Sequence, residues 1–310
     1  DCIYIEDETN SGTVITSFNV DDPSTVIDTK CIMNGNDDVY VSKNAMYFYS
    51  MDWKRSRQIT TISKMSFADG IMETGESTSV SGYLNDKFAI NEINGYLYVL
   101  ATDSDKETEV NSLHVFDGEM KETGVLNEIA RGELVYAARF VGNYVYFITY
   151  KQTDPLFVAD ISDPSEPKLL GELEVSGFSE YLHIWDDTHV LGIGYGDSDR
   201  KTIKLTMFDV SDPAHPVEEN QKIFDHEGYY CEAMNNYKAV LAEPQKNLIG
   251  FAVDKYYLFS YDSGKGFELM EDASLKFENE RGYRGIYKDD DFYVAGNGEI
   301  NYFKLTWKKS

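Results

Sequence analysis

Residues 154–194, DPLFVADISDPSEPKLLGELEVSGFSEYLHIWDDTHVLGIG, decide the fold. The stretch predicts a strand, an acidic turn with proline, a second strand, a glycine-led connection, and two further strands joined by a tight turn. Asp side chains in such turns accept hydrogen bonds from their own backbone, and proline fixes φ and lacks an N–H group. The sequence ISDPSEP at 161–167 therefore ends one strand and directs the chain into the next.

The same motif recurs along the chain at intervals of roughly 40–50 residues, the period that is typical of propeller blades. Its copies are FNVDDP at 18–23, FDG at 116–118, ADISDP at 159–164 and FDVSDP at 208–213. A second marker is a two-residue turn before an aromatic strand, at Asn94-Gly95 and at Gly142-Asn143. Such pairs tolerate the positive φ angles that a tight hairpin requires. Alternation of apolar residues dominates, and no long stretch has the helical period.

These patterns predict an all-β fold, a β-propeller of four-stranded antiparallel blades that forms a single domain over residues 1–310. We place five blades and assign the two chain ends to the closure of the ring. The blades lie near 38–81, 86–131, 135–173, 180–224 and 229–277, and the closing segments are 1–34 and 282–307. The assignment gives seven blades, with six and eight as alternatives.

The central part of the chain resembles a known family. The resemblance is carried by ARFVGNYVYFITYKQTDPLFVADISDPSEPKLLGELEVSGFSEYLH at 138–183, LTMFDVSDPAHP at 205–216 and PQKNLIGFAV at 244–253. These segments are similar to the bacterial secreted β-propeller domain family, which is distantly related to WD40 repeats. The resemblance extends over most of the chain. It implies an exported protein with a non-catalytic or uncharacterised role, and further strands, often behind a membrane anchor, upstream of residue 1. It supplies no agreed active-site residues.

Charge and cysteine content restrict the partners and the location. The chain has 54 acidic and 28 basic residues and a net charge of −26, which repels nucleic acid and anionic lipid. No apolar run approaches the ~20 residues of a spanning helix, so we expect no membrane insertion by this chain. Cys2, Cys31 and Cys231 cannot all pair with one another, and we expect free or buried thiols. Because the chain opens at Asp1 with a strand-like segment, we expect an extracellular or cell-surface location, with a signal or anchor upstream.

Motifs of common enzymes are not found. The sequence has no H-E-x-x-H, G-x-S-x-G, G-x-G-x-x-G or P-loop pattern, and its five histidines are scattered. His183 shares a predicted strand face with Tyr181 and Trp185, where a packed, hydrogen-bonded histidine is expected rather than a ligand.

Two acidic loops are candidate calcium sites. Asp103 and Asp105 alternate in ATDSDKETE, and Asp197 and Asp199 alternate in GYGDSDRK. Carboxylates one residue apart can converge on Ca²⁺ when a loop curls. Neither loop has the complete twelve-residue pattern, so a solvated hairpin tip is the alternative for each.

Blade geometry predicts a binding face. The crossover from one blade to the next and the middle hairpin of a blade open at the same end, and loops on a rigid scaffold commonly carry recognition residues. The residues that we expect there are Arg131, Glu133, Asp154, Glu180, Tyr229 and Arg281. The alternative is that Asp154 and Glu180 only brace turns.

The sequence thus predicts a monomeric, non-enzymatic binding or scaffold propeller at the cell surface that recognises a protein or a glycan through these loops. The alternative is a hydrolase or lyase with an acidic site at the mouth of the central channel, which requires a deep polar pocket with two or more acids. A calcium-stabilised structural module is a third hypothesis.

Overall fold

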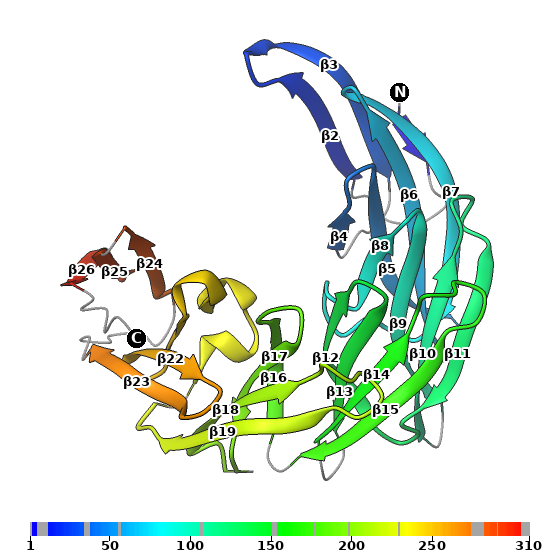
Figure 1. Cartoon of the computed structure of the whole chain (residues 1–310). Coiled ribbons are helices and arrows are strands. Elements are labelled where there is room, and N and C mark those ends of the chain that lie inside the picture. The colour runs from blue at the N-terminus through cyan, green and yellow to red at the C-terminus, as the bar shows by residue number, and fades with distance from the viewer. Residues whose placement is uncertain are drawn as a thin grey trace. The chain divides into compact units, whose positions relative to one another are not determined.

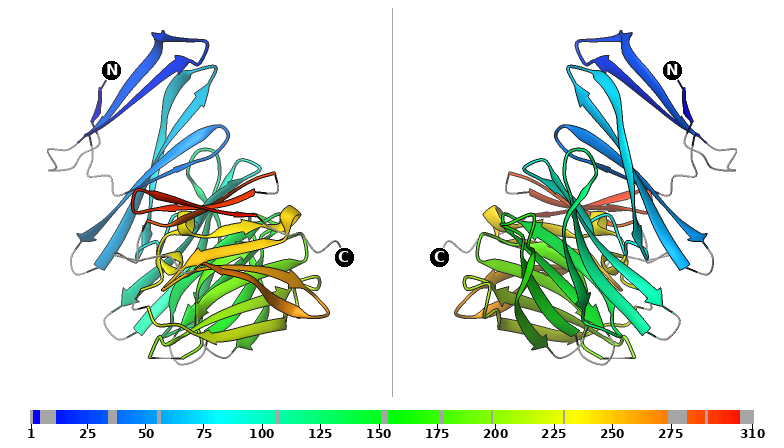
Figure 2. Two further views of the ribbon diagram at one scale, coloured as in Figure 1. Left: turned by 90° about the vertical axis from the view of Figure 1, so that its left-hand side faces the viewer. Right: turned by 90° about the vertical axis from the view of Figure 1, so that its right-hand side faces the viewer.

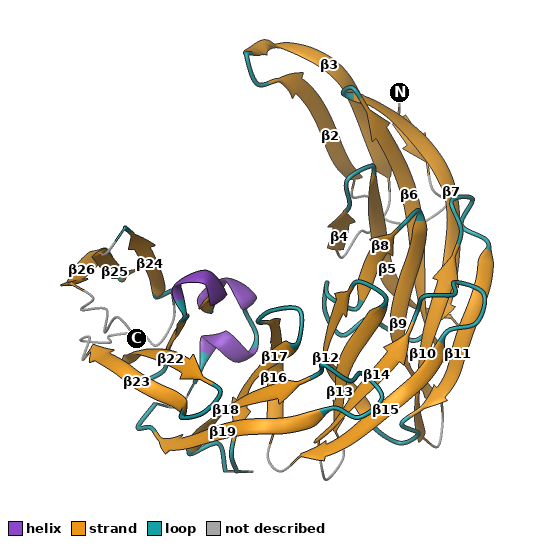
Figure 3. Cartoon of the chain, viewed as in Figure 1, coloured by secondary structure: helices purple, strands orange, loops and turns teal. Residues whose placement is uncertain are grey.

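A computed structural model gives the fold of the chain. It describes all residues except 1, 5–11, 34–37, 55–56, 106–107, 151–153, 176–177, 198, 229, 274–281, 290 and 305–310. The described residues form 26 strands in seven sheets and contain no α-helix, only three short 3₁₀ turns (Figures 1 and 3). The prediction of an all-β propeller fold built from repeated four-stranded sheets is therefore confirmed.

Two compact units divide the chain, and each is described by itself. The first comprises residues 1–135, 142–144 and 160–169, and the second comprises residues 136–141, 145–159 and 170–310. The strands of the first unit are β1 (Cys2–Tyr4), β2 (Gly12–Asn19), β3 (Asp22–Met33), β4 (Asp38–Val41), β5 (Ala45–Lys54), β6 (Arg57–Ala68), β7 (Ile71–Ser81), β8 (Ile90–Ile93), β9 (Tyr96–Asp105), β10 (Thr108–Phe116) and β11 (Glu122–Ile129). They form a three-stranded sheet in the order β1-β3-β2 and two four-stranded sheets in chain order.

The next sheet contains β12 (Leu134–Val141), β13 (Tyr144–Tyr150), β14 (Asp154–Asp160) and β15 (Lys168–Val175), and its residues are shared between the two units. The remaining strands belong to the second unit. They are β16 (Phe178–Ile184), β17 (His189–Tyr195), β18 (Thr202–Asp209), β19 (Val217–Asp225), β20 (Leu241–Glu243), β21 (Leu248–Ala252), β22 (Tyr256–Asp262), β23 (Gly266–Ala273), β24 (Arg284–Lys288), β25 (Asp291–Gly296) and β26 (Glu299–Lys304). They form two four-stranded sheets and one three-stranded sheet, and the strands of each sheet run side by side in both views of Figure 2.

The sheet of β20–β23 begins later than the sequence suggests. Its first strand starts at Leu241, because the 3₁₀ turns η1 (Glu232–Met234) and η2 (Tyr237–Ala239) occupy the preceding residues. The side chain of Asn236 caps η2 by accepting a hydrogen bond from the Lys238 N–H group. A third turn, η3 (Pro244–Lys246), lies between β20 and β21.

The acidic turns close as the sequence predicts. Between β14 and β15, the Asp160 carboxylate accepts a hydrogen bond from the Ser162 N–H group at 2.8 Å. Between β18 and β19, Asp209 accepts one from Ser211 N–H at the same distance. Asp and Asn side chains stabilise turns in this way without help from the rest of the fold. The turn between β8 and β9 is equally local, with φ values of 52° at Asn94 and 84° at Gly95.

Glycines on the outer strands receive the acidic turns of the following sheets. In the first unit, a Cβ atom at Gly124 of β11 would collide with the carbonyl oxygen of Pro164 in the β14–β15 turn. In the second unit, a Cβ atom at Gly171 of β15 would lie 2.8 Å from the Ala214 carbonyl oxygen, in the β18–β19 turn. The corresponding residue of β19 is Asn220, whose amide donates a hydrogen bond to the Ser263 carbonyl oxygen at 3.1 Å. In these three cases, the outer strand of one sheet contacts the last turn of the next sheet at the corresponding position.

Apolar side chains fill the space between sheets. In the second unit, Leu191, Ile193 and Leu205 of the β16–β19 sheet pack in one cluster with Ile249 and Phe251 of the β20–β23 sheet. Full burial of such a side chain contributes about 1.5–3 kcal/mol, so the cluster stabilises the packing of the two sheets.

Candidate functional site

Every four-stranded sheet has two ends with different loops. Because neighbouring strands run antiparallel in chain order, the middle hairpin and the crossover to the next sheet lie at one end, here called the crossover end. The first and third turns of the sheet lie at the other end, here called the turn end. The sequence analysis expected ligand recognition at the crossover end.

A pocket of about 360 Å³ lies at the crossover end of the β4–β7 sheet, within the first unit. Strands of this sheet contribute Asp38, Tyr49, Gln58 and Thr60, and the crossover at 82–89 contributes Tyr83, Asn85 and Asp86. Met51 and Leu84 add apolar surface. The pocket therefore combines acidic, amide and hydroxyl groups with aromatic and aliphatic surface.

The crossover is held in place by backbone contacts. The N–H and C=O groups of Tyr83 exchange two hydrogen bonds of 2.9 Å with Thr102 of β9. Gly82 has a φ of +94°, and a Cβ atom there would lie 2.7 Å from the Asp103 nitrogen, so glycine is required at this close approach. The Thr60 hydroxyl donates a 2.7 Å hydrogen bond to the Gly82 carbonyl oxygen. The pocket wall is thus fixed to two neighbouring sheets.

The Tyr49 hydroxyl interacts with two carboxylates of the pocket. Burial raises the pKa of its hydroxyl, and the charge and hydrogen bonding of Asp38 and the charge of Asp86 raise it further. Both carboxylates therefore act on one hydroxyl group, which stays protonated and able to donate a hydrogen bond. Asp86 is oriented by the Phe88 N–H group, which donates to its Oδ1 atom at 2.8 Å.

The sequence analysis expected ligand recognition at this end of the sheets but did not name these residues. The available signal was the succession of aromatic, amide and acidic residues in YLND at 83–86, placed between two predicted strands. The contribution of Asp38 and Tyr49 depends on packing between a crossover and the preceding sheet, which the local sequence does not show.

Arg131 and Glu133 are the predicted binding residues of the first unit, and they lie in a loop that the buried Asn111 side chain contacts. The fully buried amide of Asn111 donates 3.0 Å hydrogen bonds to the carbonyl oxygens of Ile129 and Glu133, which lie on either side of Arg131. The Arg131 guanidinium lies 3.6 Å from the Glu128 carboxylate, and both side chains are exposed. Arg131 and Glu133 thus make these contacts with residues outside the predicted set.

In the second unit, Glu180 is a half-buried acid. Its carboxylate lies 3.2 Å from the Arg200 guanidinium, which also stands 5.1 Å above the centre of the Tyr195 ring. Burial raises the pKa of Glu180, and the positive charge of Arg200 opposes this shift. Asp154 is the first residue of β14, but its side chain is outside the described part of the structure, as are Tyr229 and Arg281.

The candidate calcium residues of the second unit have local partners. Asp197 accepts hydrogen bonds from the Lys201 N–H group at 3.0 Å and from the Thr202 hydroxyl, and Asp199 lies 3.4 Å from the Lys201 ammonium. Asp103 belongs to β9, and the side chain of Asp105 is outside the described part. In the described ranges, no three His, Cys, Asp or Glu side chains form a group that could hold a metal. Calcium binding stays a prediction.

His183 is packed and hydrogen-bonded, as expected from its strand face. Its Nδ1 atom lies 2.9 Å from the Tyr181 hydroxyl. Burial lowers the pKa of His183 from 6.5 to about 4, and the nearby charge of Arg139 lowers it further while Glu243 opposes the shift. The ring is neutral near pH 7.

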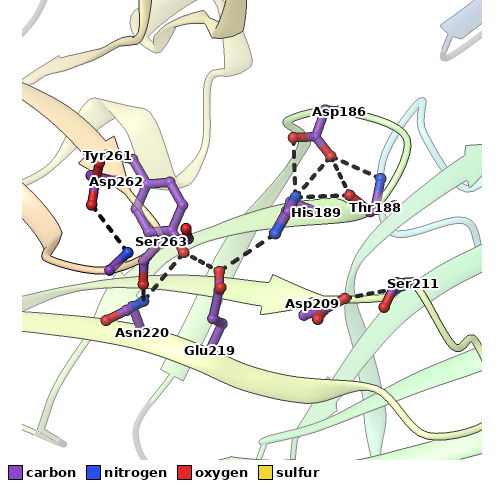
Figure 4. A network of polar contacts seen from close by, with 11 residues as sticks. Asp186, Thr188, His189, Asp209, Ser211, Glu219, Asn220, Tyr261, Asp262 and Ser263 are labelled. Atoms are coloured by element: carbon purple, nitrogen blue, oxygen red, sulfur yellow. Dashed lines mark hydrogen bonds and ion pairs between the residues drawn. The ribbon is translucent and has the colours of Figure 1, made fainter. Parts of the chain in front are cut away.

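A polar network at the turn end joins two sheets of the second unit (Figure 4). His189 of β17 lies between two carboxylates, with its Nδ1 atom 2.9 Å from Asp186 Oδ1 and its Nε2 atom 3.4 Å from Glu219 Oε2. The Tyr261 hydroxyl of β22 donates a hydrogen bond to the same Glu219 oxygen. The network connects the β16–β19 sheet with the β20–β23 sheet. The sequence signal for it was Asp-x-x-His, a spacing that recurs in the hydrogen bond between Asp212 and His215.

Glu232 joins η1 to β24 at the crossover end. Its two carboxylate oxygens lie 2.8 and 3.1 Å from the Arg284 guanidinium nitrogens. The Gly282 N–H group donates a 2.7 Å hydrogen bond to Oε2, and the Asn236 amide donates one to Oε1. Hydrogen bonding from Arg284 is the main cause that lowers the pKa of Glu232 from 4.5 to about 2, and burial opposes it.

The Glu232 contacts predict acid sensitivity. A carboxyl whose pKa is lowered on folding adds stability that is present above its unfolded pKa of 4.5 and is lost as the pH falls through about 2. We expect Glu232→Gln to lower the free energy of unfolding at pH 7 by about 2 kcal/mol and to flatten its decline over this pH range. Urea unfolding at several pH values measures both effects. The exposed Glu268→Gln is the matched control, and a Glu232→Gln curve that parallels the wild type contradicts the assignment.

Two archaeal proteins are similar in sequence to most of this chain. An uncharacterised protein of Archaeoglobus fulgidus is 35% identical over 260 residues, which cover 83% of this chain and 39% of the relative. An uncharacterised protein of Methanocaldococcus jannaschii is 32% identical over 223 residues, which cover 71% of this chain and 35% of the relative. The chain therefore spans less than two thirds of the length of these archaeal relatives.

In the described ranges, no helix has the length and apolar character required to cross a bilayer. The bacterial origin, the secretion and the relation to WD40 repeats that the resemblance implies stay predictions. The sequence model of a family described as "Beta propeller domain" matches residues 1–306, nearly the whole chain. Together with the repeated four-stranded sheets, this match shows that the chain belongs to the beta-propeller domain family.

Proposed function

We propose that the chain is a non-enzymatic binding propeller, exposed outside the cell or on its surface, that recognises a sugar unit of a glycan. The observation that carries the proposal is the pocket at the crossover end of the β4–β7 sheet. Its volume of about 360 Å³ lies at the small end of the range for ligand pockets, which run from about 300 to 1,000 Å³. That size suits a short saccharide better than a folded protein loop.

The chemistry of the lining suits a polyhydroxylated ring. Each sugar hydroxyl both donates and accepts a hydrogen bond, so a sugar site needs acceptors and donors together. Asp38 and Asp86 supply acceptors, while the amides of Gln58 and Asn85 supply both kinds of group. The rings of Tyr49 and Tyr83, with Met51 and Leu84, offer apolar surface for the C–H groups of the sugar.

The pocket is also preorganised. Tyr83 is tied to β9 by two backbone hydrogen bonds, and Thr60 is tied to the crossover through Gly82. Groups that are already fixed lose little conformational entropy when a ligand binds, so weak individual contacts can add up to useful affinity.

The pair of carboxylates in the pocket is the observation that favours a hydrolase as the second candidate. A glycosidase uses one protonated and one ionised carboxyl group on either side of the scissile bond. Binding without turnover supports the binding propeller, whereas release of sugar that depends on both Asp38 and Asp86 supports the hydrolase.

A glycan array probed with the whole chain, followed by calorimetry with the best oligosaccharide, tests the proposal. We expect Tyr49→Phe to weaken binding at least about tenfold, because a hydrogen bond polarised by a charged group contributes about 1.5–3 kcal/mol. Tyr302→Phe is the matched control, since Tyr302 donates its hydroxyl to an exposed carboxylate, that of Asp291, on the three-stranded sheet of the second unit. The proposal fails if no glycan binds, or if Tyr49→Phe binds as tightly as the wild type. Binding of a purified surface protein in place of a glycan selects the protein-binding alternative.

Two further expectations accompany the proposal. Surface exposure predicts that a membrane-impermeant reagent labels the chain on intact cells, and protection until the cells are lysed would contradict it. We also expect a monomer, which light scattering at several concentrations measures. The net charge of −26 supports both solubility and the absence of nucleic-acid partners.

A further inference from the structure

We propose that Trp53 forms a second subsite beside the pocket, an aromatic surface on which the next sugar unit of the glycan stacks. This inference rests on the proposed function and adds the length of the ligand to it, because a second subsite requires an oligosaccharide rather than a single sugar. Trp53 is not among the residues that line the pocket itself.

The strand register brings Trp53 next to the pocket. Side chains of a strand alternate between the two faces of a sheet, so Tyr49, Met51 and Trp53 of β5 share one face. Tyr49 and Met51 line the pocket. Trp53 is also directly opposite Gln58 of β6, a third lining residue, and the Cβ atoms of such a pair are about 4.5–5.5 Å apart. Trp53 therefore borders the pocket on the side of the β5–β6 hairpin.

The indole ring of Trp53 is open to water. The residue is 67% exposed, whereas Tyr49 on the same strand face is only 7% exposed. Single apolar residues occur on every protein surface, so exposure alone would not indicate a site. The distinguishing feature of Trp53 is its place in register with a lining residue of a polar pocket. A ligand that extends from the pocket over the ring would remove this apolar surface from water.

The aromatic surface is carried by a regular strand pair. β5 and β6 pair without a register shift over ten consecutive positions, which end at Lys54 and Arg57. The backbone of Trp53 is therefore already ordered before a ligand binds. A tryptophan side chain has only two χ angles, so its fixation by a stacked sugar costs little conformational entropy.

Stacking on an aromatic ring suits a sugar unit. A sugar ring presents C–H groups on its face, and the face of an aromatic ring carries the partial negative charge that attracts them. The hydroxyl groups of a sugar on this open surface keep their hydrogen bonds to water. Because the pocket of about 360 Å³ is at the small end of the range for ligand pockets, further units of a glycan lie outside it. The pocket then selects the first unit, and Trp53 selects ligands that are long enough to reach it.

Calorimetry with glycan fragments of different length tests the proposal. The probes are the best oligosaccharide of the glycan array and its fragments, shortened one unit at a time to the shortest that binds. We expect Trp53→Ala to weaken binding of the oligosaccharide about tenfold and to leave binding of the shortest fragment within about twofold. Tyr49→Phe is expected to weaken both by the same factor, because it acts within the pocket. Phe18→Ala is the matched control, since Phe18 is a 52% exposed aromatic residue of β2.

The outcomes separate this inference from the proposed function. If no glycan binds the chain, both fail. If Trp53→Ala binds every fragment as the wild type does, or weakens the shortest fragment as much as the oligosaccharide, the second subsite is contradicted while binding at the pocket stands. Because the Trp53 side chain is exposed, we expect the variant to be as stable as the wild type, which urea unfolding checks.

Fluorine NMR gives a readout at the residue itself. The chain labelled with fluorotryptophan has three signals, one for each tryptophan, and the Trp53 signal is the one that is missing from Trp53→Phe. We expect the oligosaccharide to shift the Trp53 signal and to leave the signal of the buried Trp185 in place. A Trp53 signal that does not move at saturating oligosaccharide overturns the proposal.

Discussion

Replacement of Gly124 by alanine is expected to lower the free energy of unfolding by about 3 kcal/mol, the upper end of the cost of overpacking. The added methyl group would collide with the carbonyl oxygen of Pro164 and lie 2.9 Å from the carbonyl carbon of Ser165. Both atoms belong to the backbone of the turn that follows β14, so no side-chain rotation relieves the overlap. The turn must move away from β11, and its packing on the outer strand is lost.

Urea unfolding of Gly124→Ala beside Gly118→Ala measures this effect. Gly118 has no neighbouring atom within 4 Å of an added Cβ atom, and we expect a change within about 0.5 kcal/mol there. Gly171→Ala is expected to fall between the two, since its Cβ atom would lie 2.8 and 2.9 Å from two carbonyl oxygens. Equal stability of Gly124→Ala and Gly118→Ala would show that the turn does not rest on the glycine.

Replacement of Asn111 by leucine is the second large change, with an expected loss of about 3 kcal/mol in the free energy of unfolding. The variant leaves the carbonyl oxygens of Ile129 and Glu133 without the amide donor. It also removes the acceptor of the 2.7 Å hydrogen bond from the buried Thr102 hydroxyl. A buried polar group that loses its partner keeps the full desolvation cost.

Amide hydrogen exchange shows which backbone segment opens more often in Asn111→Leu. Asn111 holds the loop at 129–133, and within it the Gly132 N–H group donates a 2.8 Å hydrogen bond to the Glu109 carbonyl oxygen. We expect faster exchange at Gly132 in Asn111→Leu. Asn220→Leu is the control, because its amide makes weaker, partly exposed hydrogen bonds of 3.1 and 3.3 Å, and a loss of about 1 kcal/mol is expected. A loss as large as that of Asn111→Leu would show that burial of the amide is not the cause.

The sequence was informative where the interactions are local. Asp160 and Asp209 close their turns with N–H groups two residues away, and Asn94-Gly95 adopts its turn from its own backbone preferences. Strand alternation then follows from which face each strand buries. These features predict the class of fold.

The candidate site depended on contacts between residues far apart in the sequence. Tyr83 meets Thr102 only after the crossover folds against β9, and outside the site Glu232 meets Arg284 across 52 positions. The pairing of β1 with β3 is parallel and covers three residues, and short parallel pairing has no local turn signal. The residues at 232–239 differ for another reason, because they form two 3₁₀ turns before the next strand, and the Asn236 side chain caps the second of them.

The capped turns have a consequence for the behaviour of the chain in acid. Hydrogen bonds from Ser165, Ser211 and His215 lower the pKa values of Asp163, Asp209 and Asp212, respectively. These carboxylates therefore keep their charge at a pH at which carboxyl groups of ordinary pKa have taken up a proton. As the medium is acidified, these turns therefore stay anionic longer than exposed carboxylates of ordinary pKa do, which favours retention of the chain on a cationic resin into the acidic range.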